Sequence, residues 1–140
     1  MKKLLVLSVF IASIFYGCEK QDLHDQLNGT WKIIGIGGSF QGWQTVKDFD
    51  LVSFSESGTY TVFYENAAVE GGSYKIEKFD PKKYGSTSEY HVNFNKSYNH
   101  NCTSNFYTSS NLAILFCGND TLYLSEYECT DGFSYGFVRK

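Results

Sequence analysis

Short runs in which apolar and polar residues alternate, separated by turn-forming residues, are the feature that most constrains this chain. Val, Ile, Leu, Phe and Tyr recur at every second position of these runs, which is the spacing of a strand with one buried face. A single helical turn is expected at 22–27, and no run of ten or more residues has helical spacing. The predicted strands are Trp31–Ile34, Phe49–Ser55, Thr59–Tyr64, Ser73–Glu77, Glu89–Phe94, Leu112–Cys117, Thr121–Tyr127 and Phe133–Arg139.

The segments between these runs contain the residues that hairpin turns require. Gly, Asn and Asp tolerate positive φ, and they occur in 56–58, 70–72, 118–120 and 130–132. Aromatic residues make up 18% of the chain, Gly occurs 13 times and Pro once, a composition that favours strands joined by turns. A chain of 140 residues is long enough for one such domain. About eight successive antiparallel strands predict an all-β fold, either an up-and-down barrel or a sandwich.

Residues at the two ends of this strand series favour the barrel. Gly29 and Trp31 resemble the Gly-x-Trp opening of lipocalin-type barrels, which follows a short helical turn. In that superfamily a basic residue of the last strand lies over this tryptophan, and Arg139 has the corresponding place. Physically, closing a barrel pairs the first strand with the last, and an Arg over an indole gains cation–π attraction and apolar cover. The resemblance, which extends to small bacterial lipocalin-like lipoproteins, implies one up-and-down antiparallel barrel; the alternative for Trp31 is a core position in another β-domain.

The N-terminus has the three parts of a secretory signal. A short basic start precedes an apolar run at 4–15 that is too short to span a bilayer comfortably, and Gly17 supplies the small residue at the cut. The stretch Ile14-Phe15-Tyr16-Gly17-Cys18 resembles the lipobox of bacterial lipoproteins, which implies that Cys18 is lipidated and that the chain is cleaved before it. The alternative is an ordinary signal peptide followed by a chance cysteine.

These features predict the layout and location of the protein. We expect residues 1–17 to be the lipoprotein signal peptide, 18–28 a lipidated tether with a helical turn, and 29–140 the barrel. Acyl chains on Cys18 would hold the domain to a membrane, so we expect a monomer anchored at the outer membrane or cell surface of a Gram-negative bacterium. Loss of the leader removes two of the 12 basic residues and leaves 10 against 15 acidic ones, a net charge of −5. This charge argues against nucleic acid as a partner.

Three cysteines remain after Cys18, so one of them has no partner within the chain. An exported chain meets an oxidising compartment, in which disulfides form. A strand of about eight residues at ~3.3 Å each separates Cys117 from Cys129, which is beyond disulfide reach. The loop of Cys102 opens at the end of the barrel where the strand before Cys129 finishes. We therefore predict a Cys102–Cys129 disulfide and a free, buried thiol at Cys117.

Residue patterns that carry catalysis are missing from the sequence. It contains no Gly-x-Ser-x-Gly, no phosphate-binding glycine loop and no pair of histidines at metal-ligand spacing. His24, His91 and His100 are scattered, and His100 lies with Cys102 in a polar stretch that has the composition of a solvated loop. We therefore expect a protein that is not an enzyme and that has no metal and no cofactor.

Two functions of different classes remain. In the first, the barrel binds a small hydrophobic or aromatic ligand, as the lipocalin resemblance implies; alternatively the same side chains simply fill the barrel, because eight strands enclose little more than their own side chains. In the second, the protein is an inhibitor-like interaction module that binds a protein or glycan through the loops at 84–90 and 98–107. An apolar cavity favours the first, and a filled core with an aromatic surface patch favours the second. The pocket candidates are Phe54, Tyr60, Val62, Tyr74, Tyr90, Val92, Phe94, Phe116, Leu122 and Leu124.

Overall fold

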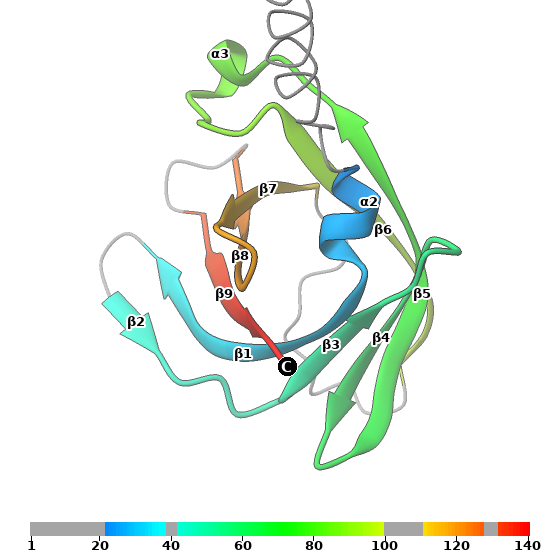
Figure 1. Ribbon diagram of the computed structural model, residues 1–140. Helices are drawn as coiled ribbons and strands as arrows, with labels where there is room; N and C mark the ends of the chain where they lie inside the picture. The colour runs from blue at the N-terminus through cyan, green and yellow to red at the C-terminus, as the bar shows by residue number, and fades with distance from the viewer. Residues whose placement is uncertain (1–21, 39–41, 100–110, 128–131) are drawn as a thin grey trace, which may run out of the picture.

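The computed structural model of the protein describes residues 22–38, 42–99, 111–127 and 132–140. Its strands form one antiparallel sheet that closes on itself (Figure 1). The elements are α2 (Leu23–Leu27), β1 (Gly29–Gly38), β2 (Gly42–Gln44), β3 (Leu51–Phe54), β4 (Thr59–Tyr64), β5 (Ala67–Lys78), α3 (Pro81–Tyr84), β6 (Tyr90–Asn99), β7 (Leu112–Cys117), β8 (Thr121–Glu126) and β9 (Ser134–Arg139).

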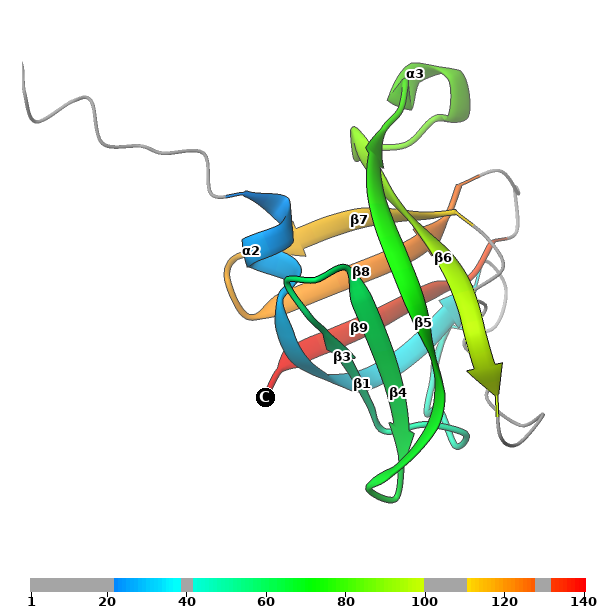
Figure 2. The ribbon, with the colours of Figure 1, turned by 90° about the vertical axis from the view of Figure 1, so that its right-hand side faces the viewer.

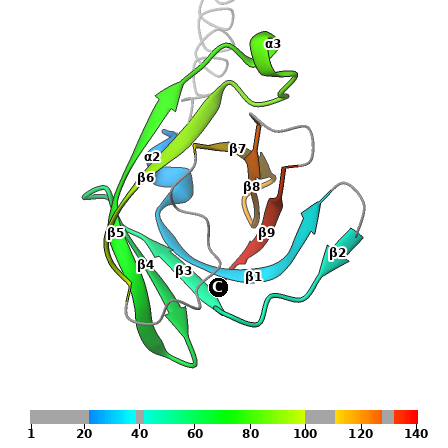
Figure 3. The same ribbon diagram turned by 180° about the vertical axis from the view of Figure 1, so that it is seen from behind.

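The closure of the sheet involves both edges of β1. Trp31 pairs with Val52 of β3 on one edge and with Arg139 of β9 on the other, and the strands from β3 to β9 follow in sequence order. The predicted all-β, up-and-down antiparallel barrel of eight strands is therefore confirmed. A ninth strand, β2, was not predicted. It pairs with the end of β1 and lies beside the closed barrel in Figure 3.

Alternate residues of the strands point into the barrel and form one core. On β3, Val52 and Phe54 pair with the inward residues Val62 and Tyr60 of β4. Burying so many aliphatic and aromatic side chains is the main favourable contribution to folding. The buried cluster consists of Leu27, Trp31, Phe49, Val52, Phe54, Tyr60, Val62, Val69, Tyr74, Val92, Phe94, Leu112, Ile114, Leu122, Leu124, Tyr135 and Phe137.

One end of the barrel is closed by α2. Figure 2 shows this helix against the strands of the barrel, beside the connection from β3 to β4. The helix begins after Asp22, whose carboxylate accepts from the backbone N–H of His24 at 3.1 Å. Leu27 is fully buried, and its carbonyl accepts from the indole Nε1 of Trp31 at 2.7 Å. The helical turn expected at 22–27 is thus confirmed, and its last carbonyl holds the indole of Trp31 through this hydrogen bond.

Arg139 completes the closed end, as the sequence predicts. Its Cζ lies 4.3 Å from the centroid of the Trp31 ring, within cation–π range. The same guanidinium donates to the carbonyls of Gln26, Asn28 and Asn119 at 2.6, 2.8 and 3.1 Å. The last strand is thereby fastened to α2 and to the connection between β7 and β8.

The turn predicted at 70–72 is wrong. The chain turns earlier, at Glu65 and Asn66, both of which have positive φ (48° and 67°). Two consecutive residues with positive φ match the tight hairpin turn whose twist suits antiparallel strands. As a result β5 begins at Ala67 and not at Ser73, and it is twelve residues long.

Gly72 allows close strand packing instead. A Cβ on Gly72 would lie 2.1 Å from the carbonyl oxygen of Asn95 on β6, so a larger residue does not fit there. Bulges flank this point, one opposite Val62 and one between Gly71 and Gly72. Glu70 keeps the alternation of β5, four residues before the inward Tyr74, and lies inside the barrel opposite Val62 with none of its surface exposed.

A further bulge changes which face of β1 is buried. The register with β9 shifts between Ile33 and Gly35, so Ile33 and Ile36 pack against the core whereas Ile34 is 53% exposed. The sequence predicts that the glycine-rich stretch after Ile34 bends the end of the first strand or leads into a long loop at the mouth of the barrel. It remains part of β1, and the bulge lies just before it.

The only described cysteine is Cys117, which is free and exposed. The prediction that this thiol is buried is therefore wrong, because its side chain points to the outer face of β7. Cys18, Cys102 and Cys129 lie outside the described residues, so the lipidation site and the Cys102–Cys129 disulfide remain predictions. Within the described ranges, no helix is both long enough and apolar enough to cross a membrane.

Candidate functional site

The predicted pocket residues lie mostly in the packed core. Val62, Val92, Leu122 and Leu124 have no exposed surface, so no water-sized space adjoins them. Phe54, Tyr60, Tyr74 and Phe94 are 1–6% exposed, and Phe116 packs against the cluster while partly buried. Tyr90 is half-buried and lies outside this cluster. Most of these side chains therefore belong to a packed core without space for a ligand. Whether any of them also contacts a ligand stays a prediction.

Aromatic rings fill this part of the barrel by direct contact. The ring centroids of Tyr60 and Phe94 are 4.9 Å apart in an edge-to-face arrangement, and those of Phe54 and Tyr74 are 5.3 Å apart. The hydroxyl of Tyr74 donates to the carbonyl of Ser55 at 2.9 Å. Burial raises the pKa of the Tyr74 phenol above its usual value, so this hydroxyl keeps its proton and its role as donor.

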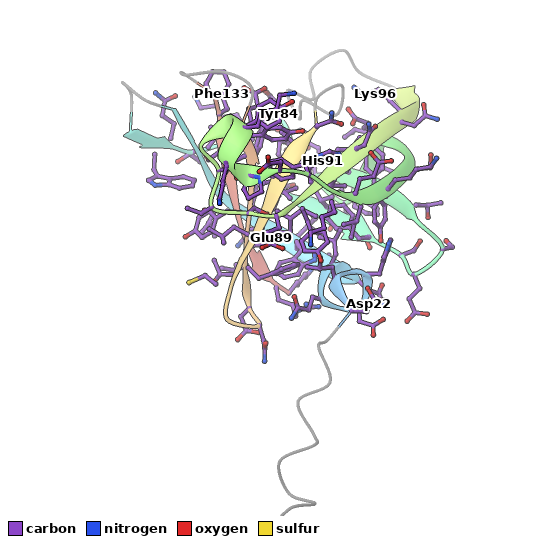
Figure 4. The ribbon with its side chains drawn as sticks, turned by 90° about the horizontal axis from the view of Figure 1, so that it is seen from above. Asp22, Tyr84, Glu89, His91, Lys96 and Phe133 are labelled. Carbon is purple, nitrogen blue, oxygen red and sulfur yellow. The ribbon has the colours of Figure 1, made fainter. Side chains whose placement is uncertain are left out.

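A polar group interrupts this apolar interior. The fully buried carboxylate of Glu70 accepts from the hydroxyl of Tyr60 at 3.1 Å, and the ammonium of Lys96 lies 2.8 Å from its other oxygen. Figure 4 places Lys96 at the end of the barrel opposite Asp22. The sequence analysis missed this group because it placed Glu70 in a turn. The sequence did contain a signal for this buried charge. Glu70 is a charged residue between Val69 and two glycines, inside a β-type region.

A Lys96→Met substitution is expected to destabilise the fold. It would leave the Glu70 carboxylate buried without its cation, and removing one partner of a buried pair is costly. Since the Lys96 side chain is itself 36% exposed, we expect a loss of about 2–3 kcal/mol in unfolding free energy. Lys78→Met is the matched control, because Lys78 and its partner Glu89 are 68% and 59% exposed and such pairs contribute about 0–1 kcal/mol. Equal losses in urea unfolding would show that the Glu70 pair does not stabilise the barrel.

A hollow of about 320 Å³ lies at the rim opposite α2. Ile36 and Tyr135, which pair across β1 and β9, form one side, and Phe49 and Val46 of the connection before β3 form another. The rings of Phe49 and Tyr135 are 6.4 Å apart and both residues are at most 1% exposed, so they lie beneath the hollow, and its accessible apolar surface comes from the half-buried Ile36 and Val46. Polar residues at 44, 45, 47 and 48 complete the wall. An apolar base with a few polar groups at the edge is the usual build of a small-molecule site.

Another cluster, on the outside of the barrel, connects three segments. The two ring nitrogens of His91 lie 3.0 Å from the hydroxyl of Tyr127 and 3.3 Å from a carboxylate oxygen of Glu77. Phe79 stacks on Tyr127 at 4.5 Å, and Tyr84 meets the same ring edge-on at 5.1 Å. Figure 4 shows Tyr84 and His91 close together beside α3. The cluster fastens the connection that contains α3 to the barrel wall.

The described residues contain no group of three or more His, Cys, Asp or Glu side chains placed to hold a metal ion. Comparisons of the chain with protein-family models, with curated proteins and with solved structures found no significant match. The function must therefore be inferred from the rim hollow and the surfaces around it.

Proposed function

We propose that this protein is a lipid-anchored, non-enzymatic binding protein that holds a small hydrophobic or aromatic molecule at the rim of its barrel. The observation that carries the proposal is the rim hollow of about 320 Å³, with Ile36 and Val46 in its walls and the buried rings of Phe49 and Tyr135 beneath them. Its size lies near the lower end of small-molecule pockets, which begin at about 300 Å³. The solid core beneath it supports binding at the rim rather than deep in the interior.

The lipocalin-like character of the barrel supports the same proposal. Gly29, Trp31 and Arg139 occupy the positions that the resemblance assigns to them, and the closed strand order is compatible with that superfamily. Barrels of this kind bind ligands at one end while the other end is closed. The membrane anchor at Cys18, the signal peptide at 1–17 and the location at an outer membrane or cell surface belong to the proposal and rest on the sequence.

Binding at the rim can be tested by filling the hollow. Val46→Trp places a large ring in the space where the ligand would lie, so we expect at least a tenfold loss of affinity for N-phenyl-1-naphthylamine, an uncharged aromatic probe. Ile34→Trp adds the same ring to an exposed position of the neighbouring strand and should bind the probe as wild type does. Fluorescence titration measures both constants, and equal affinities in the two variants would contradict binding in the rim hollow.

A further inference from the structure

An exposed phenylalanine lies at the rim, on the inner face of the barrel. Phe133 directly precedes β9 and is 41% exposed. Tyr135 and Phe137 of β9 are buried in the core, and Phe133 continues their alternation toward the rim. The pairing of β8 with β9 extends to Phe133, because its carbonyl accepts from the backbone N–H of Glu126 at 2.9 Å and its own N–H donates to the Glu126 carboxylate at 3.1 Å. Figure 4 shows Phe133 at the end of the barrel opposite Asp22.

The ring of Phe133 rests on the end of β1. Two of its carbons lie 3.3 Å from the position that a Cβ would occupy on Gly38, so the missing side chain at Gly38 makes room for the ring. Gly38 comes two residues after Ile36, which lines the rim hollow. On the neighbouring strand Phe133 comes two residues before Tyr135, the partner of Ile36. Phe133 does not line the hollow itself, but only one step of two strand residues, ~7 Å, separates it from the residues that do.

The apolar surface at the rim therefore continues across β1. Val46 and Ile36 are half-buried in the wall of the hollow, and the exposed ring of Phe133 follows on the side of β9. Ile36 pairs with Gln44 on one edge of β1 and with Tyr135 on the other. The polar residues that line the hollow, at 44, 45, 47 and 48, belong to the first of these edges, and Phe133 belongs to the second. The rim thus has a polar side, an apolar middle and an aromatic far side.

From this arrangement we infer that Phe133 sets the length of the ligand, so that the rim site selects unbranched apolar chains that reach from the hollow to its ring. The inference rests on the proposed function, because it names the ligand of the same hollow. The polar group of the ligand would lie among the side chains at 44–48, and the chain would cross Ile36 and end on Phe133. An extended alkyl chain needs about five methylene groups to cover the additional ~7 Å.

A chain fits this surface better than a compact molecule does. A compact molecule that fills the hollow leaves the ring of Phe133 in water, whereas a chain that reaches the ring removes further apolar surface from water on both partners. The ring is also held on Gly38 before a ligand arrives, which reduces the entropy lost on binding. Phe133 should therefore add affinity for long chains and none for short ones.

A series of unbranched 1-alkanols tests this length dependence. The full chain with Cys18→Ser, which should need no detergent, is the background for every variant. Displacement of N-phenyl-1-naphthylamine, corrected for the affinity of each variant for that probe, gives the dissociation constants of 1-hexanol, 1-octanol, 1-decanol and 1-dodecanol. With Phe133 present, 1-dodecanol should bind at least thirtyfold more tightly than 1-hexanol, because each additional methylene leaves water.

Substitutions at the ring separate its contribution from that of the hollow. Phe133→Ala should bind 1-hexanol as its parent does and 1-dodecanol at least fivefold more weakly, since about five methylene groups lose their apolar contact. Phe133→Leu should retain most of the affinity for 1-dodecanol. Trp43→Ala is the matched control, because Trp43 is also exposed but its ring lies on Gly35 and Gly136, on the outer face of the same two strands. It should leave the whole series unchanged.

Two kinds of negative result are distinguishable. If neither the probe nor any alkanol binds, or if Val46→Trp binds them as its parent does, both the rim site and this inference are wrong. If Val46→Trp blocks binding but Phe133→Ala keeps the full gain from 1-hexanol to 1-dodecanol, the rim site stands and the role of Phe133 is refuted. An equal loss of 1-dodecanol affinity in Trp43→Ala would also refute it, because that result places the chain on the outer wall.

Discussion

Cys18→Ser is expected to abolish labelling by an alkynyl palmitate analogue and to release the domain from membranes. The acyl chains on the cysteine would supply the apolar contact that holds the protein at the bilayer, and each buried CH₂ contributes about 0.8 kcal/mol. Without the thiol there is nothing to acylate. Metabolic labelling followed by fractionation of cells measures both effects, and we expect a change from almost complete membrane association to almost complete solubility.

Cys117→Ser provides the matched control. Cys117 is a free, exposed thiol on β7, so its replacement should change neither the label nor the fractionation. If the Cys18→Ser protein stays with the membrane and the wild type carries no label, the lipobox interpretation is wrong. A wild type that is secreted without label would instead support an ordinary signal peptide.

Trp31→Ala should cost more stability than any other single change considered for this barrel. The side chain is fully buried, it donates to the carbonyl of Leu27 at 2.7 Å, and it supports the guanidinium of Arg139 at 4.3 Å. Truncating a buried tryptophan costs about 3–5 kcal/mol. A loss of that size is a large share of the free energy of unfolding of a typical domain, which is about 5–15 kcal/mol.

Trp43→Ala makes the same chemical change at an exposed position. Because Trp43 is 57% exposed, its loss should change the unfolding free energy by no more than about 1 kcal/mol. Urea unfolding of both variants, followed by far-UV circular dichroism, gives the two values. Similar losses would mean that Trp31 is not the residue that closes the barrel.

The features that follow from strand pairing and turn chemistry could be predicted from the sequence. The alternation in the runs from Thr59 to Tyr64 and from Thr121 onwards identified strands, and Gly58 and Gly118 adopt positive φ in the predicted turns. The contact of Trp31 with Arg139 was implied by the resemblance to lipocalin-type barrels, and it agrees with the pairing of the first and last strands in a closed sheet. In each case a local rule and the closure of the barrel lead to the same structure.

The errors occur where two rules compete. Glycines at 71 and 72 have the composition of a turn, yet Gly72 is needed where β5 approaches β6, and the turn lies at Glu65 and Asn66. Glu70, which the sequence analysis placed in the turn predicted at 70–72, lies in the core instead. In β1 the bulge between Ile33 and Gly35 shifts the alternation, so Ile36 packs against the core. Period-two alternation cannot locate an inserted residue.

The sequence did not identify the rim hollow, because none of the predicted pocket residues lines it. The pocket candidates were chosen as inward residues, and most of them became the core below the rim. The residues that line the hollow come from the connection at 44–49 and from the strand ends at Ile36 and Tyr135. Tertiary contacts bring these segments together, and no local pattern marks them.

Native mass spectrometry of the full-length protein, released from the membranes of its own host in mild detergent, tests the central proposal most directly. We predict that the wild type carries a non-covalently bound small apolar molecule in addition to its covalent acyl chains. The Val46→Trp protein, prepared in the same way, should carry the acyl chains alone. A wild type without any bound small molecule, or equal occupancy in the two proteins, would contradict a ligand-binding function at the rim of the barrel.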